Sequence, residues 1–467
     1  AELLTKGITI GAGVLPARGS DAMMHSDLQG GIMRQIAIVG SGPAGYYTAE
    51  AASKKWGNNV RVDVFDALPV PYGLIRTGVA PDHQSIKKVA LRYEKTALSD
   101  NVRFVGNVRI GRDVTVAELR DLYDAVILAT GAPDDRKLDL EGDQLTNVFG
   151  SAAFVGWYNG HPKFADLDPD FSGKHAVVIG MGNVALDVAR ILAKTASEME
   201  GSDIVAHALE ALKASTLETI TILGRRGPHQ IMMTPKELGE LLELERAAPL
   251  VEKDDLPLAD KDAELEPGVR KSVDLLRRFA ELPPTRRSRA TIGIDFKFFF
   301  GPRAFLGEDG KLKGLEIERM KVENGRAVGT GELKRLPADI AITCIGYRAS
   351  PLGNVPFNER AGRFESTEGR IFPGLYCVGW AKRGPTGTIG TNRPDGYNVI
   401  ELVSEDIGSG RSKRGRTGFD HLAEQRGLDI VTFKDWQKIE DAEIAAARTG
   451  APREKFVDVA SMIAAKR

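Results

Sequence analysis

Residues 36–50 read "IAIVGSGPAGYYTAE" and predict a strand, a glycine-rich turn and a helix in succession. In that context the glycines of a GxGxxG pattern allow a tight turn, close approach of the backbone to a pyrophosphate, and packing of the helix on the strand. The free N–H groups at the start of the helix then face the phosphates. The stretch therefore predicts a dinucleotide-binding α/β unit whose loop is made by Gly40, Gly42, Pro43, Ala44 and Gly45.

A second pattern of the same kind lies near the middle of the chain. Residues 177–190 read "VVIGMGNVALDVAR", with alanine at the third glycine position, which the pattern tolerates. Its phosphate-binding loop is expected to use Gly182, Asn183 and Val184. Two such loops in one chain indicate two dinucleotides.

The residues that follow the next strand of each unit distinguish the two ligands. Asp66 ends "VRVDVFD", and an acid at this place hydrogen-bonds a ribose diol and repels a 2′-phosphate, which favours FAD or NAD(H). Arg225 and Arg226 follow "LETITILG", and two guanidinium groups can bind the 2′-phosphate of NADP(H). A tightly held flavin and an exchangeable nicotinamide explain this difference most simply.

Composition excludes several classes of function. With 467 residues, 42% of them hydrophobic and 27% charged, the chain is expected to form two or three globular domains. A formal charge of −1 gives no overall attraction for nucleic acid. Only Cys344 and Cys377 are present, which excludes a disulfide framework, a CxxC redox pair or a four-cysteine iron–sulfur site within this chain.

Metal and membrane signals are also missing from the sequence. The seven histidines show no zinc-binding spacing, so no metal site is expected, and no apolar run is long enough for a transmembrane segment. Residues 1–32 are expected to be a non-native or disordered extension outside the fold, with a signal peptide or organelle address as the alternative. We expect a cytoplasmic location in a bacterium rather than the mitochondrial matrix.

Two further segments suit a flavin site. "YDAVILATGAP", residues 123–133, is a short apolar strand that ends at Gly131, where the backbone can approach a ligand closely. In "GLYCVGWAKRGPTGTIGTNRPDG", residues 374–396, Gly379 and Trp380 close a strand and a glycine-rich passage can cross a flat ring. A helix "YNVIELVSEDI" is expected from Tyr397, and its start can face the end of the flavin where negative charge accumulates. Simple packing of the tryptophan is the alternative.

These residues together resemble the adrenodoxin-reductase-like ferredoxin–NADP reductases from Met33 to Arg467. The motifs that carry the resemblance, in order, are "VGSGPAGYYTAE", "LPVPYGLIRTGVAPDHQSIKKV", "GNVRIGRDVT", "GMGNVALDVARIL", "GRRGP", "IGYRASP" and "GWAKRGPTGTIGTNRPDG". The resemblance implies FAD contacts at Ala44, Asp66, Leu74, Ile110, Trp380, Gly387, Thr388 and Ile389. It implies NADP contacts at Gly182, Asn183, Val184, Arg225, Arg226, Glu237 and Gly387.

Two of these positions need separate comment. Asp66 stands where relatives more often carry glutamate, which shortens the reach to the ribose without changing the role. Glu237 follows Thr234 and Pro235 in a capping-box pattern, so a helix start accounts for it equally well.

The order of the motifs predicts the architecture. We expect an α/β fold of two Rossmann-like, three-layer dinucleotide-binding domains, with the NADP domain inserted into the FAD domain. The FAD domain is expected at residues 33–134 and 345–467, and the NADP domain at residues 135–344. The two connecting strands are expected to form a hinge.

The resemblance implies a flavoprotein reductase that passes electrons from NADPH by way of FAD to a one-electron, ferredoxin-type iron–sulfur protein. His83 and Asp187 are the candidate catalytic residues, for proton exchange or for steering the nicotinamide. Alternatively, His83 caps a helix and Asp187 satisfies a backbone group or an arginine. Ferredoxins are usually acidic, and a basic helix face can dock one through Arg270, Lys271, Arg277 and Arg278, although a solvated helix explains these residues too.

Two other functions use the same cofactors. An NADPH-dependent flavin monooxygenase or oxidase would pass the electrons to oxygen. A non-catalytic dinucleotide-sensing subunit would bind both cofactors and turn over neither.

Overall fold

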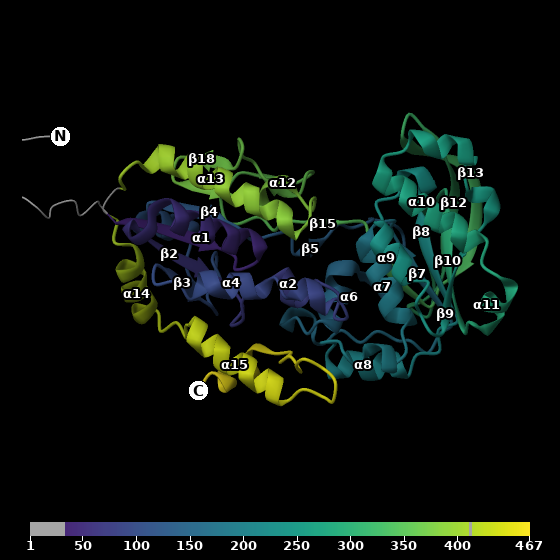
Figure 1. Cartoon of the computed structure of the whole chain (residues 1–467), viewed down its shortest axis with the longest axis horizontal. Coiled ribbons are helices and arrows are strands. Elements are labelled where there is room, and N and C mark those ends of the chain that lie inside the picture. Colours follow the sequence, from purple (N-terminus) through teal and green to yellow (C-terminus); the bar gives the residue numbers. More distant parts are fainter. Residues whose placement is uncertain (1–32, 411–412) are drawn as a thin grey trace, which may run out of the picture.

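The computed structural model describes residues 33–410 and 413–467, so the expectation for residues 1–32 lies outside the described part of the chain. Two units of the chain lie side by side along its long axis (Figure 1). The first contains strands from both ends of the described sequence, and the second contains the middle of the chain.

The first unit is built on a six-stranded sheet in the order β18-β19-β4-β1-β2-β3. Its strands are β1 (Arg34–Val39), β2 (Val60–Phe65), β3 (Val102–Val105), β4 (Ala125–Leu128), β18 (Arg370–Phe372) and β19 (Leu375–Cys377). All neighbours are parallel except β18 and β19. The central strands read as continuous apolar runs because both faces of the sheet are covered.

Helices cover both faces of this sheet. On one face, α1 (Pro43–Trp56) and α13 (Asn392–Ile407) form a core with Ile36 and Ile38 of β1. On the other face, α5 (Val116–Leu122) and α14 (Gly415–Gln425) pack against Ala37 and Val39. The predicted three-layer α/β arrangement is therefore confirmed for this unit.

The second unit has an all-parallel six-stranded sheet in the order β6-β14-β7-β8-β10-β9. The strands are β6 (Val148–Gly150), β7 (His175–Ile179), β8 (Thr219–Gly224), β9 (Ala247–Val251), β10 (Ile292–Phe298) and β14 (Ile340–Thr343). One face packs on helices that include α6 (Ser151–Tyr158), α7 (Asn183–Ala193), α8 (Ala206–Lys213) and α10 (Pro267–Ala280).

The other face of this second sheet carries an antiparallel layer that the sequence analysis did not anticipate. It consists of β11 (Phe300–Glu308), β12 (Lys311–Glu323) and β13 (Arg326–Pro337). Leu312, Leu315 and Ile317 of β12 pack against Val177 and Ile179 of β7. The third layer of this unit is therefore a β-sheet rather than helices.

Two short strands cross between the units. They are β5 (Asp134–Asp135) and β15 (Tyr347–Arg348), and they pair antiparallel with each other. The remaining elements are α2 (Leu74–Thr77), α3 (Gln84–Lys87), α4 (Ala90–Ala97), α9 (Pro235–Glu240), α11 (Pro284–Arg289), α12 (Trp380–Arg383), α15 (Phe433–Ala445), α16 (Val459–Ala465), β16 (Phe357–Asn358) and β17 (Arg363–Phe364). Short 3₁₀ turns lie between several of them.

Candidate active site

The first glycine loop joins β1 to α1 and has room for a ligand at one place. A Cβ on Gly40, whose φ is +115°, would lie 2.3 Å from the Ala129 carbonyl oxygen, and one on Gly45 would lie 1.9 Å from the Gly40 oxygen. At Gly42 the nearest atom to such a Cβ is the Cα of Gly73, at 3.8 Å. The loop is therefore closed on its two protein-facing sides and open over Gly42, as a phosphate cradle requires.

Asp66 fixes this loop from the end of β2. Its Oδ2 accepts hydrogen bonds from the backbone N–H of Ser41 at 3.1 Å and from the Ser41 hydroxyl at 2.5 Å, while its Oδ1 accepts one from the Leu68 N–H at 2.9 Å. Burial raises the pKa of Asp66. The sequence predicted a ribose contact here, and the structure adds a second task, which is to hold the glycine turn.

Three other predicted flavin residues differ in their burial and surroundings. Leu74 follows Gly73 directly and is partly exposed, whereas Ile110 is buried. Gly131 has φ +68°, and a Cβ placed on it would meet no atom within 4 Å, while the hydroxyl of the adjacent Thr130 is buried without a hydrogen-bond partner. A buried hydroxyl of this kind next to open backbone suits a polar, flat ligand such as the flavin, so the residues present fit that group.

Trp380 stands at the start of α12, on the side of the loop that faces the second unit. Its Nε1 donates to the Thr386 carbonyl at 3.0 Å, and its ring centroid lies 6.1 Å from that of Tyr347 in the linker strand β15. Asp395 in the first turn of α13 accepts from the Gly379 N–H at 2.5 Å and pairs with Arg383 at 2.6 Å. The buried carboxylate of Asp395 thus fixes the turn around Trp380.

The second glycine loop opens onto a crevice between the units. A Cβ on Gly180 would lie 2.2 Å from the Cys344 oxygen, whereas one on Gly182 would meet no atom within 4 Å. The crevice has a volume of about 1410 Å³. Its lining includes residues from the second unit and, opposite them, from the first: Gly182, Asn183, Val184, Arg225, Arg226, Trp380 and Gly387.

Arg225 and Arg226 follow β8 and are both exposed at the crevice. Within residues 33–410 and 413–467, neither guanidinium group is engaged by a carboxylate. The linkers add Arg136, Lys137 and Arg348 to the lining, which the sequence analysis missed. Arg225 and Arg226, which have no such carboxylate partner among the described residues, can therefore bind an anionic group such as a phosphate.

His83 and Asp187 meet in a cluster that we call the Arg190 hub. The Arg190 guanidinium, 1% exposed, contacts Asp82 at 2.9 and 3.0 Å, Asp187 at 2.8 Å and Glu240 at 3.0 Å. The members of the hub are Asp82, His83, Asp187, Arg190, Lys194 and Glu240.

The hub joins the two units. Its Asp82 and His83 precede α3 in the first unit. In the second unit, the other members lie in α7, directly after α7 and at the end of α9. His83 Nε2 lies 2.9 Å from Glu240 Oε2, and His83 Nδ1 lies 4.0 Å from Asp187 Oδ1. Burial opposes ionisation of Asp82, yet Arg190 and Lys194 hold its pKa below the ordinary value.

The alternatives considered for these residues have clear outcomes. His83 occupies the N-cap position of α3, but its side chain accepts no hydrogen bond from the helix. Asp187 pairs with Arg190, which agrees with the alternative that it satisfies an arginine. Thr234 precedes α9 without a side-chain cap, so the capping box proposed for Glu237 does not form. Neither Glu237 nor any hub residue is among those that line the crevice.

Glu240 and Arg190 are functional candidates that sequence reasoning missed. Glu240 is one of several glutamates in "PKELGELLELE", and nothing in that pattern separates it from its neighbours. Its importance arises only because α9 packs beside α7 and the turn before α3.

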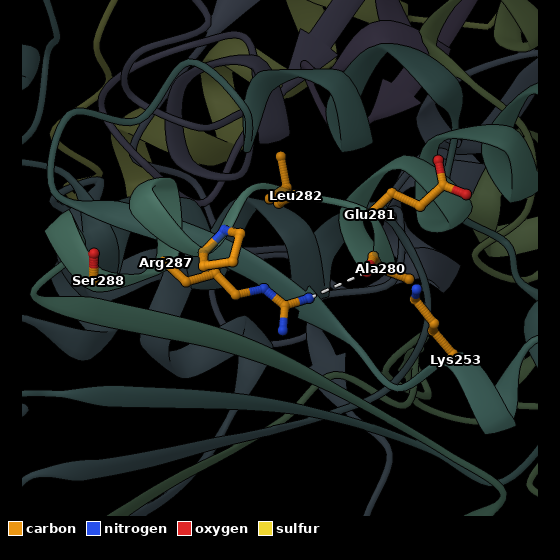
Figure 2. Close-up of a pocket in the computed structure, with 7 residues that line it drawn as sticks. Lys253, Ala280, Glu281, Leu282, Arg287 and Ser288 are labelled. Carbon is orange, nitrogen blue, oxygen red and sulfur yellow. Dashed lines mark hydrogen bonds between the residues drawn. The ribbon is translucent and has the colours of Figure 1, made fainter.

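A second depression lies at the end of α10 and beside α11 (Figure 2). It has a volume of about 730 Å³, and Arg287 there donates to the Ala280 carbonyl at 3.4 Å. No residue predicted to bind a cofactor lines it. Across the described ranges, no helix is long and apolar enough to cross a membrane, and no group of side chains is arranged to hold a metal ion.

Comparison with known proteins gives consistent similarities. The sequence pattern of the pyridine nucleotide-disulphide oxidoreductase family matches residues 34–243. The chain is 41% identical to the mitochondrial NADPH:adrenodoxin oxidoreductase of Homo sapiens over 449 residues, which cover 92% of this chain and 91% of that protein. It is 40% identical to the NADPH-ferredoxin reductase FprA of Mycobacterium leprae, covering 92% and 98% of the two chains.

A solved structure is similar over the same length. The Mycobacterium tuberculosis FprA structure in complex with NADPH superimposes with a TM-score of 0.89 at 36% identity, over 93% of this chain and 99% of that chain.

Proposed function

The chain belongs to the family of NADPH:adrenodoxin oxidoreductases and NADPH–ferredoxin reductases, and on that premise we propose that it is an FAD-containing reductase of a ferredoxin-type iron–sulfur protein. One observation supports this proposal above the others. A single crevice has the second glycine loop and its two arginines on one wall, and Trp380 and Gly387 of the first unit on the other. When bound, FAD takes electrons in pairs from a nicotinamide and passes them on singly.

We assign residues 33–134 and 345–467 to FAD binding and residues 135–344 to NADP binding. In the first part, the start of α1 and Gly42 are suited to the pyrophosphate, and Asp66 to the ribose. The proposed FAD contacts are Gly40, Gly42, Pro43, Ala44, Gly45, Asp66, Leu74, Ile110, Gly131, Gly379, Trp380, Gly387, Thr388 and Ile389.

In the second part, the start of α7 is suited to the pyrophosphate of NADPH, and the paired arginines are suited to its 2′-phosphate. The proposed NADP contacts are Gly182, Asn183, Val184, Arg225, Arg226, Glu237 and Gly387. Asn183 also accepts a hydrogen bond from the Thr234 N–H at 2.9 Å, which ties the loop to the start of α9.

His83 and Asp187 are proposed to act at the junction of the two units rather than on the crevice wall. The Glu240 carboxylate fixes the His83 ring through Nε2, and Arg190 holds both Glu240 and Asp187. These contacts fix the orientation of the His83 ring at the place where the two units meet.

The docking surface and the compartment are finer proposals. We propose that an acidic ferredoxin docks on α10 through Arg270, Lys271 and Arg278, which are exposed. Arg277, the fourth residue suggested by the sequence, is engaged in a two-contact ion pair with Asp262 at 2.7 and 2.9 Å. For the compartment we propose the bacterial cytoplasm, which cell fractionation would check.

Anaerobic stopped-flow absorbance tests the function. The purified yellow protein is mixed with NADPH or NADH, and a ferredoxin is then added. We expect NADPH to bleach the flavin much faster than NADH, and ferredoxin to restore the colour. If oxygen alone restores it while a substrate is hydroxylated, the protein is a monooxygenase, and if neither nucleotide bleaches it, the protein is a dinucleotide sensor.

Arg225→Ala and Arg226→Ala test the nucleotide assignment. Each is expected to weaken NADPH binding roughly tenfold to a hundredfold, because a charge-assisted contact contributes about 1.5–3 kcal/mol. NADH binding should not change, since NADH lacks the phosphate. Arg289→Ala, at an exposed arginine of α11, is the matched control and should leave both affinities unchanged.

A further inference from the structure

The C-terminal part of the chain crosses from the first unit to the second. Residues 446–458, between α15 and α16, form a segment that we call the C-terminal strap. In the view of Figure 1, the linker strands β5 and β15 join the units along the upper side, and the segment after α15 reaches α8 along the lower side. The units are thus connected at two separate places.

Arg448 attaches the strap to the loop before α8. Its Nη1 donates to the Ile204 carbonyl at 2.9 Å, and its Nη2 donates to those of Ser202 at 2.9 Å and Met199 at 3.1 Å. Glu454 Oε1 accepts from the Ala206 N–H at 2.8 Å, at the first residue of α8. These bonds satisfy backbone groups of the second unit with side chains of the C-terminal segment.

Asp203 lies at the centre of this contact. It belongs to the second unit and is 4% exposed. Two lysines of the first unit approach its carboxylate: Lys87 of α3 at 2.8 and 3.0 Å, and Lys455 of the strap at 3.4 Å. The Lys455 side chain is fully buried, and its Nζ also donates to Asn159 Oδ1 at 3.3 Å.

A wider set of charges surrounds these three groups. Arg76 forms a buried two-contact pair with Glu443 of α15, and Arg453 contacts Glu440 at 2.7 Å and Glu443 at 3.7 Å. Burial lowers the pKa of Lys455 well below its usual value, and although burial opposes ionisation of Asp203, the two lysines lower its pKa. Removing the Asp203 charge would leave two ammonium groups buried together with an amide oxygen as a shared partner.

Asp203 also contacts the turn that carries the hub. Its backbone N–H donates to the Pro81 carbonyl at 3.1 Å, and Asp82 and His83 follow Pro81 directly. The strap, Asp203, the turn and the Arg190 hub therefore form one continuous contact between the units. The linker strands β5 and β15 connect the units through two residue pairs, so the strap contact is a second restraint on the placement of the units.

We propose that Asp203 is a positioning residue through which the C-terminal strap fixes the placement of the nicotinamide unit against the flavin unit. The inference rests on the proposed function, because placement matters only if a nicotinamide must react across the crevice. Reaction rates fall steeply when reacting groups are misplaced by about 1 Å. Loosening the strap should therefore slow flavin reduction without changing the nucleotide site itself.

The test uses the full-length holoenzyme with Asp203→Asn, Lys455→Met and Arg448→Gln. Lys438→Met is the matched control, since Lys438 donates to the Lys466 carbonyl within the C-terminal segment. We expect faster hydrogen–deuterium exchange of the amides of residues 199–206 and 80–84 in the three variants. We also expect single-turnover flavin reduction by NADPH to slow by roughly tenfold or more. Flavin content and the Kd for NADP⁺ should stay at the wild-type values.

Three results would overturn the proposal: unchanged exchange, faster exchange with an unchanged reduction rate, or slower reduction matched by a weaker Kd for NADP⁺. Arg448 is only partly buried, so Arg448→Gln decides the matter if the two buried substitutions prevent folding. Failure of the proposed function looks different, because then the wild-type flavin itself is not bleached by NADPH.

Discussion

Arg190 shows how one residue can serve both units at once. Its guanidinium group is almost completely buried and contacts carboxylates of the turn before α3, of α7 and of α9. A buried cation in this position compensates charges that would otherwise repel one another. Arginine suits the place because its planar fork reaches Asp82 with two nitrogens while a third contacts Asp187 and Glu240.

Arg190→Met is expected to lower the free energy of unfolding by about 3–5 kcal/mol at pH 7, the usual cost of leaving buried charges unpaired. Without the arginine, the pKa of each neighbouring carboxyl in the folded state rises relative to the wild type, because burial opposes ionisation and Arg190 no longer offsets it. The folded variant then binds more protons than the folded wild type, so the loss should be smaller at pH 5 than at pH 7. Urea unfolding at both pH values measures it, and equal losses would point to packing alone.

His161 predicts a separate pH dependence. Burial lowers the pKa of His161 to about 4, and its Nδ1 accepts a hydrogen bond from the Lys163 N–H at 3.1 Å, which requires an unprotonated Nδ1. Between pH 6.5 and pH 4 the unfolded chain binds a proton that the folded protein does not. The resulting loss of unfolding free energy as pH falls through this window is up to about 3 kcal/mol.

His161→Asn should remove this dependence, since the asparagine side chain can accept the same N–H without titrating. Urea unfolding of the variant and the wild type should agree near pH 7 and diverge below pH 6, with the variant more stable. A constant difference between the two proteins across the pH range would contradict the assignment.

The residues that could be predicted from the sequence act through local backbone. Gly40, Arg225 and Arg226 come directly after strands, and Gly45 lies in the first turn of α1, so their positions at the end of a sheet are fixed by a few neighbouring residues. The hub could not be predicted, because its members come from residues 80–84, 183–194 and 235–240. Their meeting depends on how the two units pack, which no local spacing records.

At the scale of elements, each glycine loop leads into the start of a helix, α1 or α7. The two loops differ in how well they tolerate an added side chain. Gly45→Ala would place a Cβ 1.9 Å from the Gly40 carbonyl oxygen, while Gly182→Ala would meet no protein atom within 4 Å. We expect Gly45→Ala to lose flavin and to unfold at lower temperature, because α1 can no longer pack on β1. We expect Gly182→Ala to fold normally and to weaken NADP⁺ binding, because the pyrophosphate needs that space.

Flavin absorbance of the purified variants, thermal unfolding and NADP⁺ titration separate these outcomes. Gly57→Ala is not a suitable control, because Gly57 has φ +54° and alanine would be strained there. Gly239 lies within helix α9, and a Cβ added to it would meet no atom within 4 Å. Gly239→Ala should therefore leave flavin content and NADP⁺ affinity unchanged. Normal flavin content in Gly45→Ala would refute the close packing of α1 on the first loop.

Element boundaries were harder to predict than element types. The sequence predicts a helix from Tyr397, but α13 begins at Asn392. The segment "TNRPDG" resembles a turn, yet a proline in the first helical turn costs no hydrogen bond, and Asp395 there accepts from the Gly379 N–H. The partner that makes this helix start favourable is distant in sequence, so the local pattern misleads.

At the scale of the whole molecule, the sequence suggests two units joined by two strands, and the structure adds further connections. The Arg190 hub and the C-terminal strap contribute buried polar contacts between the units. The prediction of which segments form each sheet rests on the motif order, because parallel strands follow their helices along the chain. The strap could not be predicted, since Arg448 and Lys455 lie in a segment without any motif.

These connections predict cooperative unfolding. A ligand that binds only the native state stabilises it by about 2.7 kcal/mol at a hundred times its Kd, and the gain spreads to every part that unfolds in the same transition. In the wild type, the strap and the hub should couple the units, so that calorimetry shows one transition and NADP⁺ raises its Tm. In Lys455→Met or Arg448→Gln, the transition should split, and NADP⁺ should raise the Tm of one component alone.

Two transitions in the wild type would mean that the units unfold independently and that the strap adds little coupling. A single transition in every variant would place the coupling in the hub, where Arg190→Met should then produce the split.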